Sequence, residues 1–207
     1  MDTKQIKEQY IHYVLEKNKR PNSIYLFMKE IALEEKVFYQ HYTTFYDLEA
    51  AIWSDTFKET IEKIQQEQVY EGYSVREKTL ALYFTLIESL KSIRTFAVYS
   101  FKNPKDFPID GGVLKESKEV FKDFIAQLMT EGIYTGEIAD RTFLTERYAS
   151  GLWWETIFIV RFWVNDSSKN FERTDAAIEK SVNLSFDLLG KNIADATFDF
   201  VKFLFSK

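Results

Sequence analysis

The sequence predicts an all-α protein, with a small N-terminal unit of three short helices followed by a larger helical domain. Three observations favour this fold class. Glycine and proline are scarce, at 7 and 3 of 207 residues, so long segments run without interruption. A sheet protein would need a turn about every 8 to 12 residues. Apolar residues make up 45% of the chain, enough for a sizeable core, and they recur at three- and four-residue steps.

The N-terminal 45 residues or so contain the signals of three short helices. The first is expected at residues 3–18, ended by Lys19, Arg20 and Pro21. Asn22 or Ser23 is placed to cap a second helix. A third begins near Glu34 or Glu35 and reaches about His41. Their spacing predicts a compact three-helix unit. The apolar positions that define the first two helices are Ile6, Tyr10, Tyr13, Val14, Ile24, Phe27, Met28 and Ile31.

The rest of the chain is predicted to form further helices joined by short turns. Ser74 and Glu77 have the spacing of a capping box, and Gly190 is expected to be a helix C-cap. Two prolines and two glycines between residues 104 and 112 predict the clearest loop. The helices are expected at residues 44–68, 74–91, 93–101, 113–131, 142–165, 175–189 and 193–205.

The segment 152–164 is apolar on nearly every side, so it must be covered over most of its circumference. One interpretation is a central helix inside a monomeric bundle. The other is burial against a second subunit, favoured because the helix at 175–189 is also apolar on more than one face. We therefore expect a homodimer formed through the helices at about 142–165 and 175–189.

The composition of the chain excludes several kinds of site and of protein. The absence of cysteine excludes disulfides, thiolate metal sites and cysteine nucleophiles, and it fits a reducing cytoplasm. The polar start of the chain lacks a signal peptide, and no apolar run approaches 18 residues. We expect a soluble cytoplasmic protein without stable membrane association. The helix at 193–205 could lie on a membrane, but docking on the protein's own body is favoured because aspartates oppose its lysines.

Residues 22–48 carry a recognisable pattern, reading N-S-I-Y-L-F-M-K-E-I-A-L-E-E-K-V-F-Y-Q-H-Y-T-T-F-Y-D-L. This segment resembles the DNA-binding signature of the TetR family, in rough form T-S-V-x-x-I-A-x-x-A-G-V-S-x-G-T-L-Y-x-H-F-x-S-K-x-x-L. The matching residues are Ser23, Ile24, Ile31, Leu33, Phe38, Tyr39, His41, Tyr42, Thr44 and Leu48. The resemblance implies a helix-turn-helix domain at residues 1–46 and a ligand-binding and dimerisation domain at residues 47–207.

Several features of this segment set it apart from the family signature. Ala32 replaces the turn glycine, so we expect it either to adopt a positive φ, at a cost of roughly 1 kcal/mol, or to force a different turn. Lys36 replaces the second glycine, and Phe45 replaces a lysine that usually contacts phosphate. Glu34 and Glu35 put negative charge at the start of the third helix, which suits the helix dipole but repels DNA.

The resemblance implies a transcriptional regulator that binds duplex DNA as a dimer and responds to a hydrophobic small ligand. In such a unit the second helix braces the third, which enters the major groove. Phe38, Tyr42 and Leu48 are expected to pack inward, while Tyr39 and His41 reach phosphates. The residues expected to contact DNA are Tyr25, Lys36, Val37, Tyr39, Gln40, His41 and Thr43.

The resemblance also places an apolar ligand pocket among the middle helices. A large hydrophobic or aromatic ligand is expected there, although an aromatic stripe at helical spacing can equally be plain core. A lone Glu88 among apolar residues is either a pocket acid or a side chain facing solvent. The residues expected to line the pocket are Tyr83, Phe84, Ile87, Phe96, Tyr99, Phe121, Phe124, Trp154, Ile157 and Phe158.

A second hypothesis keeps the fold but not DNA binding: the chain would bind an apolar, lipid-like molecule or a protein partner. This hypothesis rests on the charge of the N-terminal region, since most DNA-binding surfaces are positive. Residues 1–50 contain seven Lys or Arg and eight Asp or Glu, a net charge of −1. An enzyme is not expected, since the sequence has no catalytic His/Asp/Ser constellation and no glycine-rich phosphate loop. No cofactor and no metal ion are expected either.

Overall fold

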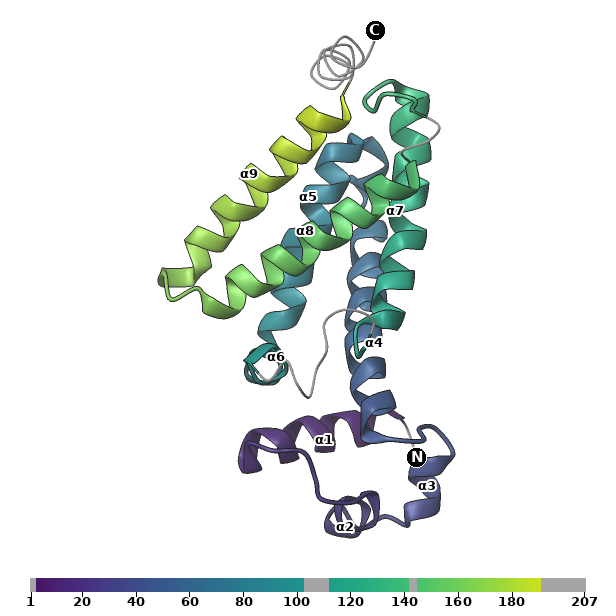
Figure 1. The fold of residues 1–207 in the computed structure, drawn as a ribbon, viewed down its shortest axis with the longest axis vertical. Coiled ribbons are helices and arrows are strands. Elements are labelled where there is room, and N and C mark those ends of the chain that lie inside the picture. The colour runs from purple at the N-terminus through teal and green to yellow at the C-terminus, as the bar shows by residue number, and fades with distance from the viewer. Residues whose placement is uncertain (1–2, 103–111, 142–144, 191–207) are drawn as a thin grey trace, which may run out of the picture. The chain divides into compact units, whose positions relative to one another are not determined.

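The computed structural model describes residues 3–102, 112–141 and 145–190 (Figure 1). Within these residues all regular structure is helical, which confirms the all-α fold class. The α-helices are α1 (Thr3–Lys17), α2 (Ile24–Glu30), α3 (Glu35–Tyr39), α4 (Phe45–Gln65), α5 (Val75–Lys91), α6 (Arg94–Lys102), α7 (Lys115–Thr135), α8 (Thr145–Asn165) and α9 (Glu172–Leu189). Two short 3-10 helices are η1 (Tyr70–Gly72) and η2 (Lys169–Phe171).

The observed boundaries follow the predicted ones closely, with three main differences. α4 ends at Gln65, three residues before its expected end, and α7 runs to Thr135, one turn beyond its expected end. α9 begins at Glu172 rather than Asp175. Neither 3-10 helix was predicted. The expected loop at 104–112, apart from Gly112, and the whole expected helix at 193–205 lie outside the described residues. No helix in the described ranges is long and apolar enough to cross a bilayer.

Hydrogen bonds at the helix ends explain where several helices begin and end. The Ser23 hydroxyl accepts the Leu26 N–H at 3.2 Å and caps α2. The predicted capping box at α5 is confirmed, since the Ser74 N–H donates to Glu77 at 2.8 Å and the Glu77 N–H donates back to the Ser74 hydroxyl at 3.3 Å. Gly190 is the C-cap of α9 as expected, but its φ of −67° is not left-handed.

Packing divides the described chain into two compact units. The first contains residues 3–59, 89–102 and 112–120, and the second contains residues 60–88, 121–141 and 145–190. The predicted division after residue 46 falls in the first turn of α4. It is therefore a division by expected function, and it remains a prediction.

An aromatic cluster centred on Phe45 holds the three N-terminal helices against the start of α4. The Phe45 ring is stacked at 5.4 Å from Tyr10 of α1 and lies 5.7 Å from Phe27 of α2. It also packs edge-to-face with Phe38 of α3, with the ring centroids 5.6 Å apart. Phe45, which stands where the signature has a lysine, therefore belongs to the core and joins the four helices α1 to α4.

The second unit is a bundle in which α8 and α9 pack as an antiparallel pair, visible in Figure 1. Polar contacts tie α5 to this pair. The buried Tyr83 hydroxyl of α5 donates to the Leu152 carbonyl of α8 at 3.0 Å. Arg76 of α5 donates to Asp187 of α9 at 3.1 Å. The apolar core includes Leu82, Leu86, Phe121, Ile125, Trp153, Ile157, Val160, Ile178, Val182 and Phe186.

Candidate functional site

The turn between α2 and α3 has the geometry of a helix-turn-helix. Ala32 adopts a φ of 57°, which confirms the first of the two expected outcomes. The Leu33 N–H donates to the Met28 carbonyl at 2.8 Å, and the Ala32 N–H donates to the Lys29 carbonyl at 3.1 Å. These two bonds form a Schellman motif with an alanine at the position that usually needs glycine. The motif stops α2 and redirects the chain into α3.

α3 presents one side to the core and the other to solvent. Phe38 is completely buried and Tyr42 nearly so, as expected for the packing side. Tyr39, on the opposite side, is 52% exposed. Lys36 and His41 are exposed with it. The three-helix unit therefore has an exposed surface on α3, as the sequence predicted.

The charges on this surface are partly paired with one another. The Lys36 ammonium lies 2.6 Å from the Glu34 carboxylate. The Tyr39 hydroxyl donates to Glu35 at 3.3 Å. Loss of hydration and the nearby Glu35 carboxylate raise the pKa of Tyr39. Its hydroxyl is a hydrogen-bond donor, currently directed at Glu35.

A buried ionic cluster fixes the three-helix unit to α4. Arg20, in the turn after α1, binds both carboxylate oxygens of the fully buried Glu49. The Tyr10 hydroxyl donates to the same carboxylate, and burial followed by the Glu49 charge raises the pKa of Tyr10. A second ion pair joins Lys7 of α1 to Asp55 of α4. The orientation of α1 on α4 is thus set by directional contacts as well as by packing.

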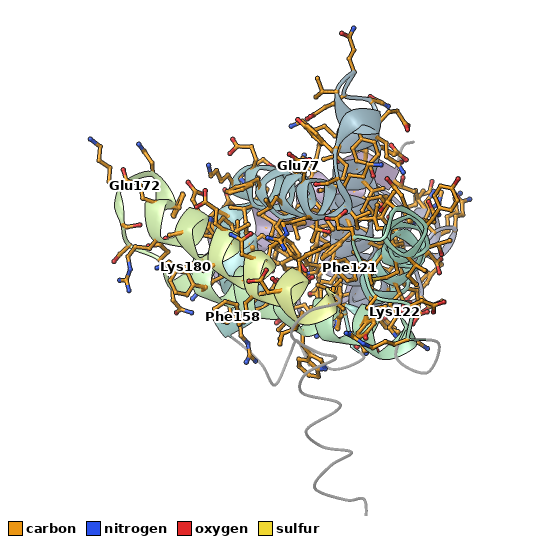
Figure 2. All side chains as sticks on the ribbon, turned by 90° about the horizontal axis from the view of Figure 1, so that it is seen from above. Glu77, Phe121, Lys122, Phe158, Glu172 and Lys180 are labelled. Atoms are coloured by element: carbon orange, nitrogen blue, oxygen red, sulfur yellow. The ribbon has the colours of Figure 1, made fainter. Side chains whose placement is uncertain are left out.

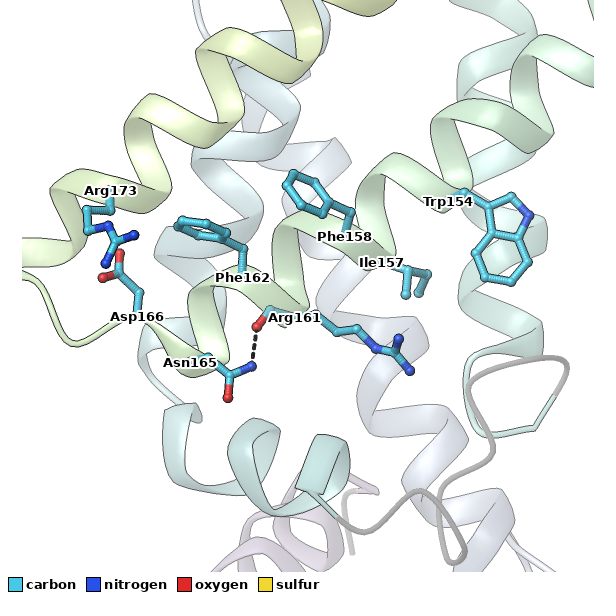
Figure 3. A pocket seen from close by; sticks show the side chains of 8 residues that line it. All are labelled: Trp154, Ile157, Phe158, Arg161, Phe162, Asn165, Asp166 and Arg173. Atoms are coloured by element: carbon cyan, nitrogen blue, oxygen red, sulfur yellow. Dashed lines mark hydrogen bonds between the residues drawn. The ribbon is translucent and has the colours of Figure 1, made fainter.

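The face shared by α8 and α9 is open and unusually apolar. Exposed α8 residues Gly151, Trp154, Phe158, Arg161 and Asn165 follow one another at alternating three- and four-residue steps. That spacing places them in one stripe along the helix. Figure 3 shows Trp154, Phe158 and Arg161 projecting from α8 along this stripe.

Two adjoining hollows, of about 530 and 590 Å³, lie along this face. Figure 2 shows Phe158 on α8 and Lys180 on the neighbouring α9, both of which line the second hollow. The Arg173 guanidinium lies 5.9 Å from the centre of the Phe162 ring, so a cationic group lies beside the aromatic side chains of the hollows. The residues lining one or both hollows are Trp154, Ile157, Phe158, Arg161, Phe162, Asn165, Asp166, Arg173, Ala176, Ala177, Lys180, Ser181 and Leu184.

Comparison with known families adds an independent observation from the other end of the chain. A family model described as "Tetracyclin repressor-like, C-terminal domain" matches residues 78–204, more than half of the 207 residues. The chain belongs to the TetR family. The matched region does not overlap residues 22–48, where the DNA-binding signature was found, so two separate segments agree. No curated protein and no solved structure matches the chain.

In this TetR chain, the residues expected to contact DNA gather on and around α3, with Tyr25 on α2. Six of the seven are exposed, and Val37 is half-buried. Thr43 has a second role, because its N–H donates to Asp47 at 3.0 Å in the cap of α4. The six exposed side chains are therefore accessible to a partner. The Thr43 hydroxyl also hydrogen-bonds Asp47, so it contributes to the cap of α4 as well.

The residues expected to line a TetR ligand pocket are distributed over three environments. Trp154, Ile157 and Phe158 line the same hollow on α8. Phe96 and Tyr99 belong to the first unit. In the second unit Tyr83, Ile87, Phe121 and Phe124 are buried, and Phe84 is half-buried. These five and the two first-unit residues do not line either of the two hollows. Glu88 is exposed, in keeping with the solvent-facing interpretation.

Sequence reasoning missed a half-buried acid between α8 and α9. The Ser185 hydroxyl donates to one oxygen of Glu155 at 2.6 Å. Burial raises the pKa of Glu155, and the hydroxyls of Ser185 and Ser181 only partly offset that effect. Arg161 of α8 and Arg173 of α9 were also missed as parts of the open face. Leu184 of α9 lies in the helix at 175–189 that was expected to form the dimer.

Proposed function

We propose that this protein is a TetR-type transcriptional regulator that binds duplex DNA as a homodimer and responds to a hydrophobic small ligand. The observation that carries the proposal is the exposed side of α3, held beyond the Ala32 turn in a chain whose residues 78–204 match the TetR C-terminal domain. In functional terms, residues 1–46 form the DNA-binding domain and residues 47–207 the dimerisation and ligand domain.

DNA binding is assigned to the exposed side of α3 and its flanks. The hydroxyl of Tyr39 and the ring of His41 are placed to meet backbone phosphates, which fix the register of a helix in the major groove. Lys36 adds a positive charge once DNA displaces its contact with Glu34. Tyr25, Val37, Gln40 and Thr43 complete the expected contact surface.

Dimerisation is assigned to the open face of α8 and α9. Exposed Trp154, Phe158, Leu184 and Leu188 form an apolar surface that a second copy of the same face would remove from water. A Cβ built on Gly151 has no neighbouring atom within 4 Å, so a partner helix can approach closely there. Two copies would present two α3 helices to major grooves about one helical turn apart.

The ligand is assigned to the second unit, which holds most of the region that matches the TetR C-terminal domain. Tyr83, Ile87, Phe121 and Phe124 supply an aromatic and aliphatic environment suited to a large hydrophobic molecule. A ligand that binds better to the form of the dimer that does not fit DNA would lower DNA affinity by that difference in binding free energy.

One observation favours a second candidate, a TetR-fold protein that binds an apolar molecule or a protein instead of DNA. Glu34 pairs with Lys36, Glu35 bonds Tyr39, and residues 1–50 have a net charge of −1. Most duplex-binding surfaces are positive, because contacts with phosphate supply much of their affinity.

The two candidates are separated by selecting ligands from a random pool of duplexes at low salt with the full chain. The DNA-binding proposal expects enrichment of a sequence with two related half-sites. It also expects Tyr39→Ala to weaken binding by about tenfold, the effect of losing one hydrogen bond of about 1.4 kcal/mol. Tyr134→Ala is the matched control, because Tyr134 is a 92% exposed tyrosine on α7. Absence of any enriched duplex, with a lipid-like molecule extracted from the natively purified protein, contradicts the proposal and supports the second candidate.

A further inference from the structure

Glu155 is an acidic side chain placed directly beneath the open face of α8 and α9. It follows Trp154 in the chain and lies one turn before Phe158, two of the exposed aromatic residues of that face. Its hydrogen-bond donor Ser185 lies one turn after Ser181, which lines the hollow together with Phe158. The carboxyl group therefore lies between α8 and α9, one turn from the apolar hollow.

The two oxygens of Glu155 differ in their surroundings. One accepts the Ser185 hydroxyl at 2.6 Å, whereas the other is buried without a hydrogen-bond partner among the described residues. A buried carboxylate oxygen without a donor is unfavourable, and protonation removes most of that penalty. The site is therefore suited to an uncharged carboxyl group.

No cation from the surrounding helices offsets the charge within the described residues. From α5 the titratable group facing Glu155 is Tyr83, whose pKa is raised by burial and then by Glu155 itself. From α9 the facing groups are the hydroxyls of Ser181 and Ser185. Of the charged residues on α9, Lys180 lines the open hollow, and Asp187 is bound by Arg76.

We propose that Glu155 is a proton-binding site that couples self-association through α8 and α9 to pH, with the dimer favoured when the carboxyl group is protonated. The inference rests on the dimer proposed above. A second copy seated on the face removes the remaining water near Glu155, which disfavours the carboxylate further. Two such groups in a symmetric dimer take up protons on association, so the dimer weakens as pH rises.

The test is the dissociation constant of the full chain, measured by sedimentation between about pH 5 and about pH 8. The proposal expects the dimer Kd to rise at least about tenfold toward the alkaline end. Glu155→Gln keeps the shape of an uncharged carboxyl, so its Kd should stay near the acid value of the wild type throughout. Glu179→Gln, at an exposed acid on α9, is the matched control and should retain the wild-type pH dependence.

A second variant tests the hydrogen bond. Ser185→Ala removes a donor that favours the carboxylate, so the pH at which the dimer weakens should move upward. Far-UV circular dichroism at each pH confirms that the variants remain folded.

The outcomes separate this inference from the proposed dimer. A dimer whose Kd is independent of pH, or one that tightens as pH rises because a partner cation pairs with the carboxylate, overturns the inference and leaves the dimer intact. The same holds if Glu155→Gln keeps the wild-type pH dependence. A chain that is monomeric at every pH overturns both.

Discussion

Arg20 donates to both carboxylate oxygens of Glu49, through Nε at 3.0 Å and Nη2 at 2.7 Å. Glu49 is fully buried on α4, while Arg20 sits in the turn between α1 and α2. Bidentate geometry of this kind is directional, so it fixes the angle at which the three-helix unit meets α4. Any motion of the start of α4 is therefore shared by α1.

Removing the Glu49 carboxylate should destabilise the protein strongly. Glu49→Ala leaves Arg20 and the Tyr10 hydroxyl without their acceptor in a buried site, and we expect a loss of about 2–4 kcal/mol. Urea unfolding followed by tryptophan fluorescence measures it. Glu30→Ala is the control, because its pair with Lys17 is exposed and 4.0 Å long, and it should change stability by less than about 0.5 kcal/mol. Equal effects of the two variants would contradict the role given to Glu49.

Ala32→Gly should stabilise the protein. Ala32 has a left-handed φ of 57°, which an alanine adopts at a cost of roughly 1 kcal/mol and a glycine adopts freely. We expect a gain of about 0.5–1 kcal/mol in the free energy of unfolding. Ala126→Gly, at an exposed position inside α7, should instead lose about 1 kcal/mol. A loss at both positions would show that the turn is not strained.

Asp166 should make stability depend on pH in the acid range. Burial alone raises the pKa of Asp166, but hydrogen bonds from Thr174 and Ser168 outweigh it and lower the pKa to about 2 from 3.8. The unfolded chain then binds a proton more readily, so the stabilisation is present above about pH 4 and is lost as pH falls toward about pH 2.

The measurement is the difference in melting temperature between wild type and Asp166→Asn as a function of pH. We expect wild type to be more stable at neutral pH and the difference to shrink toward zero by about pH 2. Asp123→Asn, at an exposed position on α7, should show only a small difference at every pH. A difference for Asp166→Asn that stays constant with pH would contradict this assignment.

Leu184→Glu should abolish self-association without unfolding the chain. Leu184 is 62% exposed on α9 and lines the hollow beside Phe158, so a charge there would be buried in the proposed interface. We expect the dimer Kd to rise at least about a hundredfold, as at a central interface residue. Val69→Glu is the control, since Val69 is equally apolar and 56% exposed but lies in the turn before η1. A dimer that tolerates Leu184→Glu would have to use another face.

The sequence predicted the elements whose ends carry local signals. Ser23, Ser74 and Ala32 mark boundaries through short-range hydrogen bonds or backbone conformation, and each behaves as expected. The position of the turn between α8 and α9 was predicted, but its backbone conformation was not, because it places Asn170 and Phe171 at positive φ without a glycine. Such a conformation is imposed by tertiary packing, here including the contact of Phe171 with Trp163.

The candidate sites could be predicted less well than the helices, and the reason is physical. Periodicity divides a helix into a buried and an exposed side, but α8 is apolar on both, so the open stripe could not be told from the core. At Phe45 the family signature, rather than the periodicity, gave the wrong guide to the role of the residue. The signature places a phosphate-contacting lysine there, whereas its ring fills the space between Tyr10, Phe27 and Phe38.

The salt dependence of duplex binding tests the proposed DNA-binding function most directly, because its slope counts the phosphates that the protein neutralises. With the selected duplex and the full chain, we expect the logarithm of the binding constant to fall with the logarithm of salt concentration at a slope of about −3 or steeper. Specific binding should also exceed binding to a scrambled duplex at every salt concentration. A slope near zero, or equal binding to both duplexes, would contradict the assignment of α3 as a DNA-reading helix.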